Sequence, residues 1–330
     1  MRTLYQQRPF FYFCFIFCIQ RKAAYYWRAF LRRKMHRTKT ISALLAALML
    51  AALWAPSLRA TQTTKPAVVP QVQVQLLTRS THRRENCRFS YGGTVTLIGA
   101  PRGAVTVEGW NRNEVELTAD IELKAETEAD LDQLAKVNGF VFDEDLNHVS
   151  ILTVGTHDRA FMKKSAKNFP KKLLNLPWKI DYRLRVPANT DLEISAGHGP
   201  VKLSGVEGAL RVSATESETE LTLTGGTVSA TITAGNVLLA IPVRSWRGGG
   251  ADIRVAAGVL NVELPAGFSG DIDADVLRTG KIVNTYEELM RREKPGITER
   301  IVRARAGAGG AFFKFTVGDG TVNIRRSGEK

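Results

Sequence analysis

The clearest pattern in the chain is a run of five nine-residue units between Gly199 and Val243, in which apolar and polar residues alternate. In register the units read GPVKLSGVE, GALRVSATE, SETELTLTG, GTVSATITA and GNVLLAIPV. Alternation with period two predicts half-buried strands, and the glycine at most unit boundaries predicts turns. Because so short a unit cannot bury its apolar face alone, we expect each unit to stack on its neighbours.

Similar alternation extends on both sides of this run. Short apolar stretches occur at 95–97, 105–107, 115–117, 253–255, 260–264, 270–276, 312–317 and 321–324. The last two flank Gly318-Asp319-Gly320, which predicts a hairpin turn. The pattern predicts an all-β fold, specifically a β-solenoid or β-helix-like stack of short strands separated by glycines. A β-sandwich is the alternative for residues 81–155, since ten-residue strand spacing fits both folds.

One segment has helical periodicity. Residues 127–137 begin with a threonine suited to an N-cap, carry acidic residues in the first turn, and place Leu131, Leu134 and Val137 on one face. We expect one accessory α-helix here. Residues 141–154 then read as a hairpin, with polar residues at its turn.

Residues 35–60 have the layout of a secretory signal peptide. A basic segment precedes the apolar run Ile41–Ala55, and small residues follow it. That run is shorter than the roughly 20 residues of a membrane-spanning helix. We therefore expect cleavage and export to the periplasm, the cell surface or the medium. Residues 1–34 are interpreted as an upstream extension, and 61–80 as a linker.

Most of the net positive charge of the chain lies in its first 60 residues. The formal net charge is +14, but residues 1–60 hold 11 of the 46 Lys and Arg residues and no Asp or Glu. The remaining 35 basic and 32 acidic residues leave only +3, so nucleic acid is not an expected partner. Beyond residue 60 there is one cysteine, Cys87, and no apolar segment of spanning length. Neither a disulfide framework nor an integral membrane segment is expected in the mature chain.

The strongest candidate for binding is a basic insert at residues 156–180, between the N-terminal strands of 81–155 and the repeats of 181–330. Its candidate surface-binding residues are Arg159, Lys163, Lys164, Lys167, Lys171, Lys172 and Trp178. Lysines interleaved with aromatic residues suit an anionic surface, with the cations meeting phosphate or carboxylate groups. The competing interpretation is a solvated loop whose apolar residues cover one end of the stack.

Signals for catalysis are sparse. The sequence has no HExxH, GxSxG, Walker or CxxC motif, its histidines lack metal-ligand spacing, and the repeats lack the aspartates of calcium-binding units. No cofactor and no metal is predicted. Asp271, Asp273 and Asp275 alternate on one strand and are the only acids suited to a carbohydrate-active β-helix enzyme. The simpler interpretation is that they form the solvated face of a strand whose other face is buried.

Several segments resemble a known bacterial family. They are YRLRVP at 182–187, LEI at 192–194, GPVKLSG at 199–205 and LPAGFSGDIDAD at 264–275. With them, residues 90–325 resemble the "putative adhesins", a family of unknown function built from β-strand repeats. The resemblance implies an exported β domain without assigned catalytic residues. The basic insert is not part of this pattern.

The sequence thus predicts a non-catalytic exported protein that acts in adhesion or as a cell-envelope scaffold. Its expected partner is a cell-surface glycan, an anionic envelope surface or an envelope protein. Two alternatives remain open. The protein could instead be an accessory or sensor protein of an envelope-stress pathway, or a β-helix carbohydrate-active enzyme.

Overall fold

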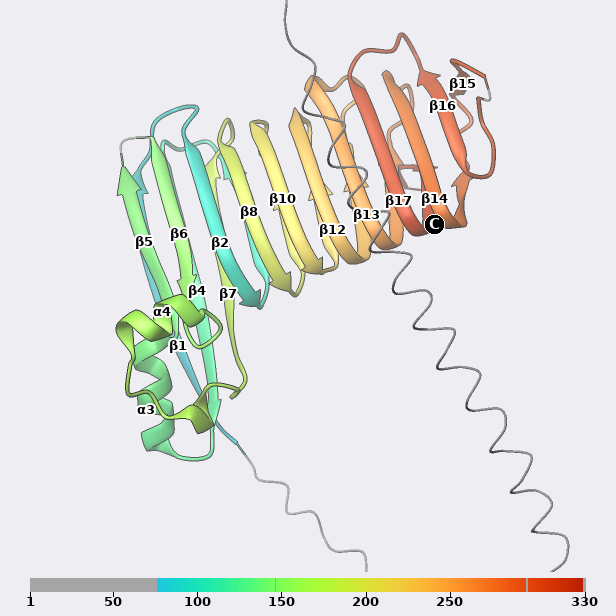
Figure 1. Ribbon diagram of the computed structural model, residues 1–330. Helices are drawn as coiled ribbons and strands as arrows, with labels where there is room; N and C mark the ends of the chain where they lie inside the picture. Colours follow the sequence, from blue (N-terminus) through green and yellow to red (C-terminus); the bar gives the residue numbers. More distant parts are fainter. Residues whose placement is uncertain (1–75, 146, 295, 329–330) are drawn as a thin grey trace, which may run out of the picture. The chain divides into compact units, whose positions relative to one another are not determined.

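The computed structural model describes residues 76–145, 147–294 and 296–328. The predictions for the upstream extension, the signal peptide and nearly all of the linker lie outside the described residues. The all-β class is confirmed, because the strands of the described part form one hydrogen-bonded sheet with only two short α-helices beside it (Figure 1). No helix in this part of the chain is both long and apolar enough to span a membrane.

The elements follow one another along the chain in a simple order. They are β1 (Leu77–Arg88), β2 (Thr94–Arg102), β3 (Val105–Trp110), β4 (Glu114–Ala125), α3 (Glu128–Val137), β5 (Gly139–Asp145), β6 (His148–Val154), α4 (Arg159–Ser165), the 3-10 turn η1 (Lys171–Leu173), β7 (Trp178–Pro187), β8 (Asp191–His198), β9 (Val201–Ser204), β10 (Ala209–Glu216), β11 (Thr219–Thr222), β12 (Gly225–Ala240), β13 (Arg247–Leu264), β14 (Gly270–Asn284), β15 (Leu289–Arg291), β16 (Ile301–Ala306) and β17 (Phe312–Arg326).

The parallel strands are arranged in rungs, each with one strand segment on either side of a sharp corner. In the first layer β2, β8, β10 and the first halves of β12, β13, β17 and β14 pair in that order. In the second layer β3, β9, β11 and the second halves of the same long strands pair likewise. Alternate residues of both layers point inward and form one apolar core.

The pairing corrects the expected stacking of the nine-residue units. Val201 pairs with Thr219, and Thr219 with Val237, so partners are 18 residues apart. Leu210 and Val228 show the same offset in the other layer. A rung therefore contains two units, and consecutive units lie in different layers because the chain turns at each boundary between units, with Ser217 in place of glycine at one of them.

The corners of successive rungs form a column of small residues. Its members, from the N-terminal end of the stack, are Gly103, Gly199, Ser217, Gly235, Gly258, Gly320 and Gly280. Gly320 has φ +143°, and a Cβ there would overlap the carbonyl oxygen of Gly258. Glycine is needed at this position both for the backbone conformation and for the close approach of the next rung.

The predicted hairpin around Gly318-Asp319-Gly320 is wrong. Residues on both sides of Gly320 belong to one strand, β17, and both halves pair in parallel with β13 and with β14. The two halves face each other across the core instead of bonding to each other. The last strand of the chain therefore lies between β13 and β14, which are consecutive in sequence.

Antiparallel strands cover both ends of the parallel stack. At the N-terminal end β5 pairs with β6 and β4 with β7, and β1 pairs with β4. Arg83 of β1 bonds Glu85 and places its guanidinium 4.2 Å from the centre of the Phe140 ring of β5.

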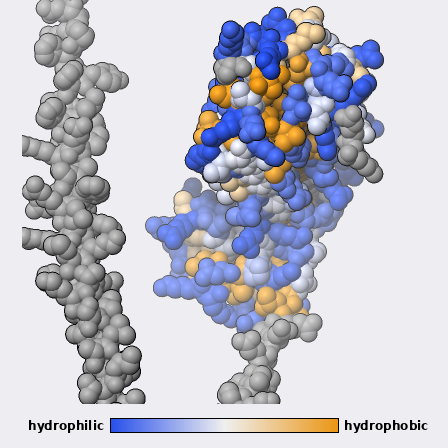
Figure 2. All heavy atoms as spheres, turned by 90° about the vertical axis from the view of Figure 1, so that its right-hand side faces the viewer, coloured by the Kyte–Doolittle hydropathy of each residue, from blue (hydrophilic) through white to orange (hydrophobic). Residues whose placement is uncertain are grey.

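At the C-terminal end of the stack, β16 pairs with β14, and β15 pairs with β16. Figure 2 shows hydrophobic residues among hydrophilic ones on that end, where Leu277 and Met290 are exposed. Charged or covered edges of this kind oppose edge-to-edge aggregation.

The helix and the first hairpin occur where the sequence predicts them. Thr127 is the N-cap of α3, and its side-chain oxygen accepts a hydrogen bond from the Asp130 amide at 3.1 Å. Leu131 and Leu134 of α3 are buried. Strands β5 and β6 form the expected antiparallel hairpin. Both predictions succeed because their signals are local in sequence.

Candidate functional site: an expanded corner of one rung

The basic insert occupies the corner of the first parallel rung. Strand β6 pairs with β2, and β7 pairs with β3, so β6 and β7 correspond to the two sides of a rung. Other rungs turn at one small residue, whereas here residues 155–177 form α4, η1 and their connections (Figure 1). The insert is thus an enlarged version of the corner that the glycine column forms elsewhere.

Local contacts fasten the insert to the body of the protein. Asp158 caps α4, where its Oδ1 accepts hydrogen bonds from the amides of Ala160 (2.8 Å) and Phe161 (3.0 Å). Met162 and Leu173 are buried. These two apolar side chains anchor the insert to the body of the protein, while Arg159, Lys163 and Lys164 stay exposed.

The cations of the insert are exposed, and most are not neutralised. The exposed ones are Arg159, Lys163, Lys164, Lys167, Lys171 and Lys172. Lys172 forms an ion pair with Asp130 of α3 at 3.0 Å, which lowers the pKa of that carboxyl. Within the described residues the other five have no acidic partner. Arginines on the strands, such as Arg254 and Arg303, are by contrast paired with neighbouring aspartates. Five unpaired cations therefore lie close together on the insert, whereas the unpaired cations of the strands, such as Arg211 and Lys314, are scattered along the chain.

Trp178 differs from the lysines in position. It begins β7 and is only 8% exposed, so it is not available as a free interfacial side chain. The His157 ring lies 5.4 Å from it, centre to centre, and desolvation lowers the pKa of His157. The structure thus separates Trp178 from the cations with which the sequence grouped it. That the cations bind a surface stays a prediction.

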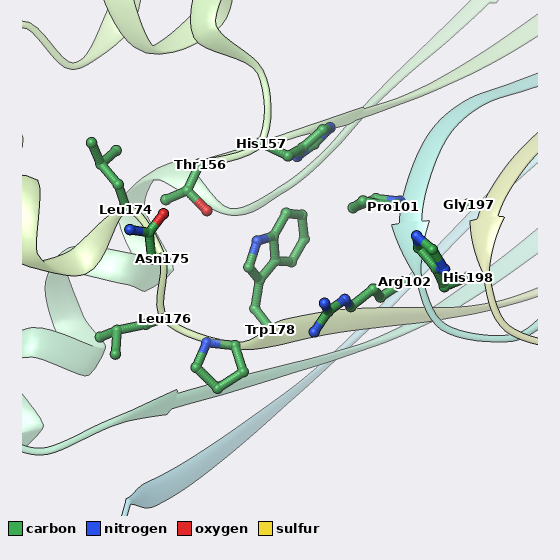
Figure 3. A pocket seen from close by; sticks show the side chains of 11 residues that line it. Pro101, Arg102, Thr156, His157, Leu174, Asn175, Leu176, Trp178, Gly197 and His198 are labelled. Carbon is green, nitrogen blue, oxygen red and sulfur yellow. The ribbon is translucent and has the colours of Figure 1, made fainter. Parts of the chain in front are cut away.

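A hollow of about 480 Å³ lies beside the insert, and Trp178 forms part of its wall (Figure 3). Its lining consists of Pro101, Arg102, Thr156, His157, Leu174, Asn175, Leu176, Pro177, Trp178, Gly197 and His198. Arg102, His157 and His198 come from β2, the insert and β8, and no pattern in the sequence groups them. Two of them, Arg102 and His198, are neighbours because the parallel pairing of β2 with β8 places them opposite each other.

The three alternating aspartates of β14 lie in a ladder of ion pairs. Asp271 contacts Arg305 at 2.8 Å, Asp273 contacts Arg292 at 2.7 Å, and Asp275 contacts Arg303 at 2.8 Å. Hydrogen bonding to Arg305 lowers the pKa of Asp271. Ile272, Ala274 and Val276, which alternate with them, are buried, as expected. The carboxylates are therefore charge-compensated rather than free. Among the described residues no cluster of His, Cys, Asp and Glu is arranged to hold a metal ion.

Comparisons with known proteins give structural neighbours only. No family model matches the chain, and no curated protein is significantly similar to it. A "putative cell adhesion protein" from Clostridium sporogenes matches with a TM-score of 0.34 at 9% identity, over 76% of this chain and 100% of the neighbour. A "putative adhesin" from Bacteroides fragilis matches with a TM-score of 0.25 at 11% identity, over 74% and 97%. A "putative lipid binding protein" from Parabacteroides distasonis matches with a TM-score of 0.19 at 12% identity, over 74% and 96%. These descriptions apply to the neighbours.

Proposed function

We propose that the protein is an exported, non-catalytic component of the cell envelope whose basic insert binds an anionic envelope surface. The observation that carries the proposal is the group of five exposed, unpaired cations on an enlarged corner of a rung. The signal-like segment at 35–60 and the resemblance of residues 90–325 to adhesins support export and an adhesive role.

The mode of binding follows from which side chains are free. Met162 and Leu173 are held in the body of the protein and Leu174 is the exposed large apolar side chain of the insert, so the insert offers mainly charge. Unpaired surface cations attract phosphate or carboxylate groups over about a Debye length, roughly 8 Å at physiological salt. Binding is therefore electrostatic, and it weakens as the ionic strength rises.

The test compares two sets of substitutions in the purified protein. The first changes Lys163, Lys164, Lys167 and Lys171 to Gln. The matched control changes Arg211, Lys281, Arg291 and Lys314 to Gln, which removes the same charge from exposed cations that have no ion pair among the described residues. Binding to isolated envelope fractions and to dextran sulfate is measured at low and high salt.

We expect salt-sensitive binding that drops at least tenfold in the insert variant and much less in the control. Equal losses in both variants would mean that net charge alone is responsible, and would contradict a dedicated surface. Binding that the insert variant retains in full would also overturn the proposal. Capture of an envelope protein instead of a polyanion would favour the signalling alternative.

A further inference from the structure

Three adjoining hollows lie along the corner where the glycine column turns. The hollow of about 480 Å³ shares Arg102, Pro177 and Trp178 with a smaller one of about 190 Å³. It shares His198 with a third of about 560 Å³, which continues past Gly199, Ser217 and Gly235 and is also lined by Glu216 and Glu218. We call these three hollows together the corner trough. The trough runs from the insert over successive rungs, so it can hold a chain molecule and not only a small ion.

The first hollow presents donors for an anion. Arg102 is exposed and has no acidic partner in the described residues, and none of the residues that line this hollow is acidic. Figure 3 shows the indole of Trp178 between the side chains of His157 and Arg102, with His198 beyond Arg102. A guanidinium offers a planar fork of N–H groups that matches a carboxylate or a phosphate.

Three carboxylates around the first hollow and the smaller one bond other groups. Glu216 bonds His198 Nδ1 at 3.2 Å, and Asp158 caps α4. Glu122, beside the smaller hollow, contacts Lys124 and Lys179. No neighbouring acid therefore neutralises Arg102, and an anion from outside the protein can occupy that position.

The rest of the wall favours a sugar over a peptide. Pro101, Leu176 and Pro177 line the hollow together with Trp178 and add apolar surface to its polar groups, and a sugar ring has an apolar C–H face as well as polar substituents. The backbone at the corner is already hydrogen-bonded from rung to rung. The Gly103 amide donates to His198 O at 3.0 Å, and the Gly199 amide donates to Glu216 O at 3.1 Å. The corner therefore offers no free strand edge for a peptide to extend.

We propose that the first hollow of the corner trough binds an anionic sugar of a polysaccharide chain, with the anionic group held by Arg102 between His157 and His198. The apolar face of that sugar packs against Trp178 and Pro101. This inference rests on the proposed function, because the lysines of the insert attract polyanions generally while the trough selects a sugar-borne anion. Trp178, too buried to enter a surface, takes part here as the wall of a subsite.

The test uses Arg102→Gln in the purified protein, with Arg211→Gln as the control for loss of one exposed, unpaired arginine. The probes are a hexamer of galacturonate, the matching neutral galactose hexamer, a phosphorylated mannose oligosaccharide and dextran sulfate. Binding is measured by isothermal titration calorimetry and by the change in tryptophan fluorescence. The two anionic oligosaccharides separate carboxylate from phosphate as the group that is recognised.

We expect R102Q to weaken binding of an anionic oligosaccharide about tenfold or more, since hydrogen bonds to charged groups contribute roughly 1.5–3 kcal/mol. The neutral hexamer should bind weakly to both proteins, and R211Q should bind as the wild type does. Unchanged affinity in R102Q, or no binding of either anionic oligosaccharide to the wild type, would overturn the trough proposal. An acidic peptide that displaces the galacturonate hexamer and binds as tightly as it does would also overturn the proposal.

The same titrations separate this inference from the proposed function. If R102Q loses the oligosaccharide while the insert variant keeps all dextran sulfate binding, the trough stands and the role of the insert falls. If the insert variant loses dextran sulfate while R102Q binds every probe normally, the insert stands and the trough falls.

Discussion

At the scale of single residues, the corner glycines are the positions where a small change has the largest consequence. Gly320 has a positive φ, and a Cβ on it would meet backbone that cannot move aside. We expect Gly320→Ala to lower the free energy of unfolding by about 3 kcal/mol. Gly139→Ala is the control, because φ there is ordinary and no atom lies within 4 Å of the new Cβ. Urea denaturation measures both, and equal midpoints would refute the close-packed column.

Burial also determines the chemistry of the single cysteine after residue 60. Cys87 of β1 is buried, and desolvation raises the pKa of its thiol to about 11. At pH 8 only about one thiol in a thousand is then ionised. We expect iodoacetamide to label Cys87 slowly in the folded protein and rapidly in urea, as measured by mass spectrometry of the Cys87 peptide. Rapid labelling of the folded protein would show that the thiol is accessible.

Asp319, at the corner of β17, links stability to pH. Hydrogen bonds from Arg278 and Thr279 lower the pKa of its carboxyl from 3.8 to about 2. A carboxyl with a lowered pKa in the folded state stabilises the protein above its unfolded pKa, and this contribution is lost as the pH falls through the folded value. We expect Asp319→Asn to be less stable than the wild type at pH 7, with most of the difference lost as the pH falls to about 2 and the remainder below it. A difference as large at pH 2 as at pH 7 would assign the effect to packing.

At the scale of elements, local signals were sufficient for some segments and insufficient for others. Helix α3 could be predicted because its cap, its acidic first turn and its apolar face lie within eleven residues. The sequence also located the insert and the exposure of its lysines. The sequence did not predict the burial of Trp178. Its position among lysines does not reveal that this residue begins a strand and is buried.

The N-cap of α3 provides a test at this scale. Removing the Thr127 hydroxyl leaves the Asp130 amide without its side-chain acceptor. We expect Thr127→Ala to destabilise the protein by about 1 kcal/mol. Thr127→Ser, which keeps the oxygen, should restore most of the loss in thermal unfolding. Equal destabilisation by both substitutions would mean that the methyl group matters and the cap does not.

At the scale of the whole molecule, the main feature is that β17, the last strand in sequence, lies between two earlier strands of the sheet. Both halves of β17 bond to β13 on one side and β14 on the other. We expect deletion of residues 312–330 to leave β13 and β14 without their shared partner, so that residues 247–306 become sensitive to protease. Deletion of residues 329–330 is the control. Limited proteolysis measures this sensitivity, and circular dichroism measures the remaining strand content. If the truncated chain resists protease as well as the control does, the result contradicts this topology.

The sequence by itself determined which residues alternate toward the core, where the chain turns, and where a capped helix forms. Period-two alternation and glycine punctuation act within a few residues, so they can be read directly. Only the tertiary structure decided which strands pair. Alternation assigns a residue to a face but names no partner strand, so the 18-residue offset and the insertion of β17 had no local signal. For the same reason, Arg102, His157 and His198, which are far apart in sequence, meet only where rungs stack at the corner.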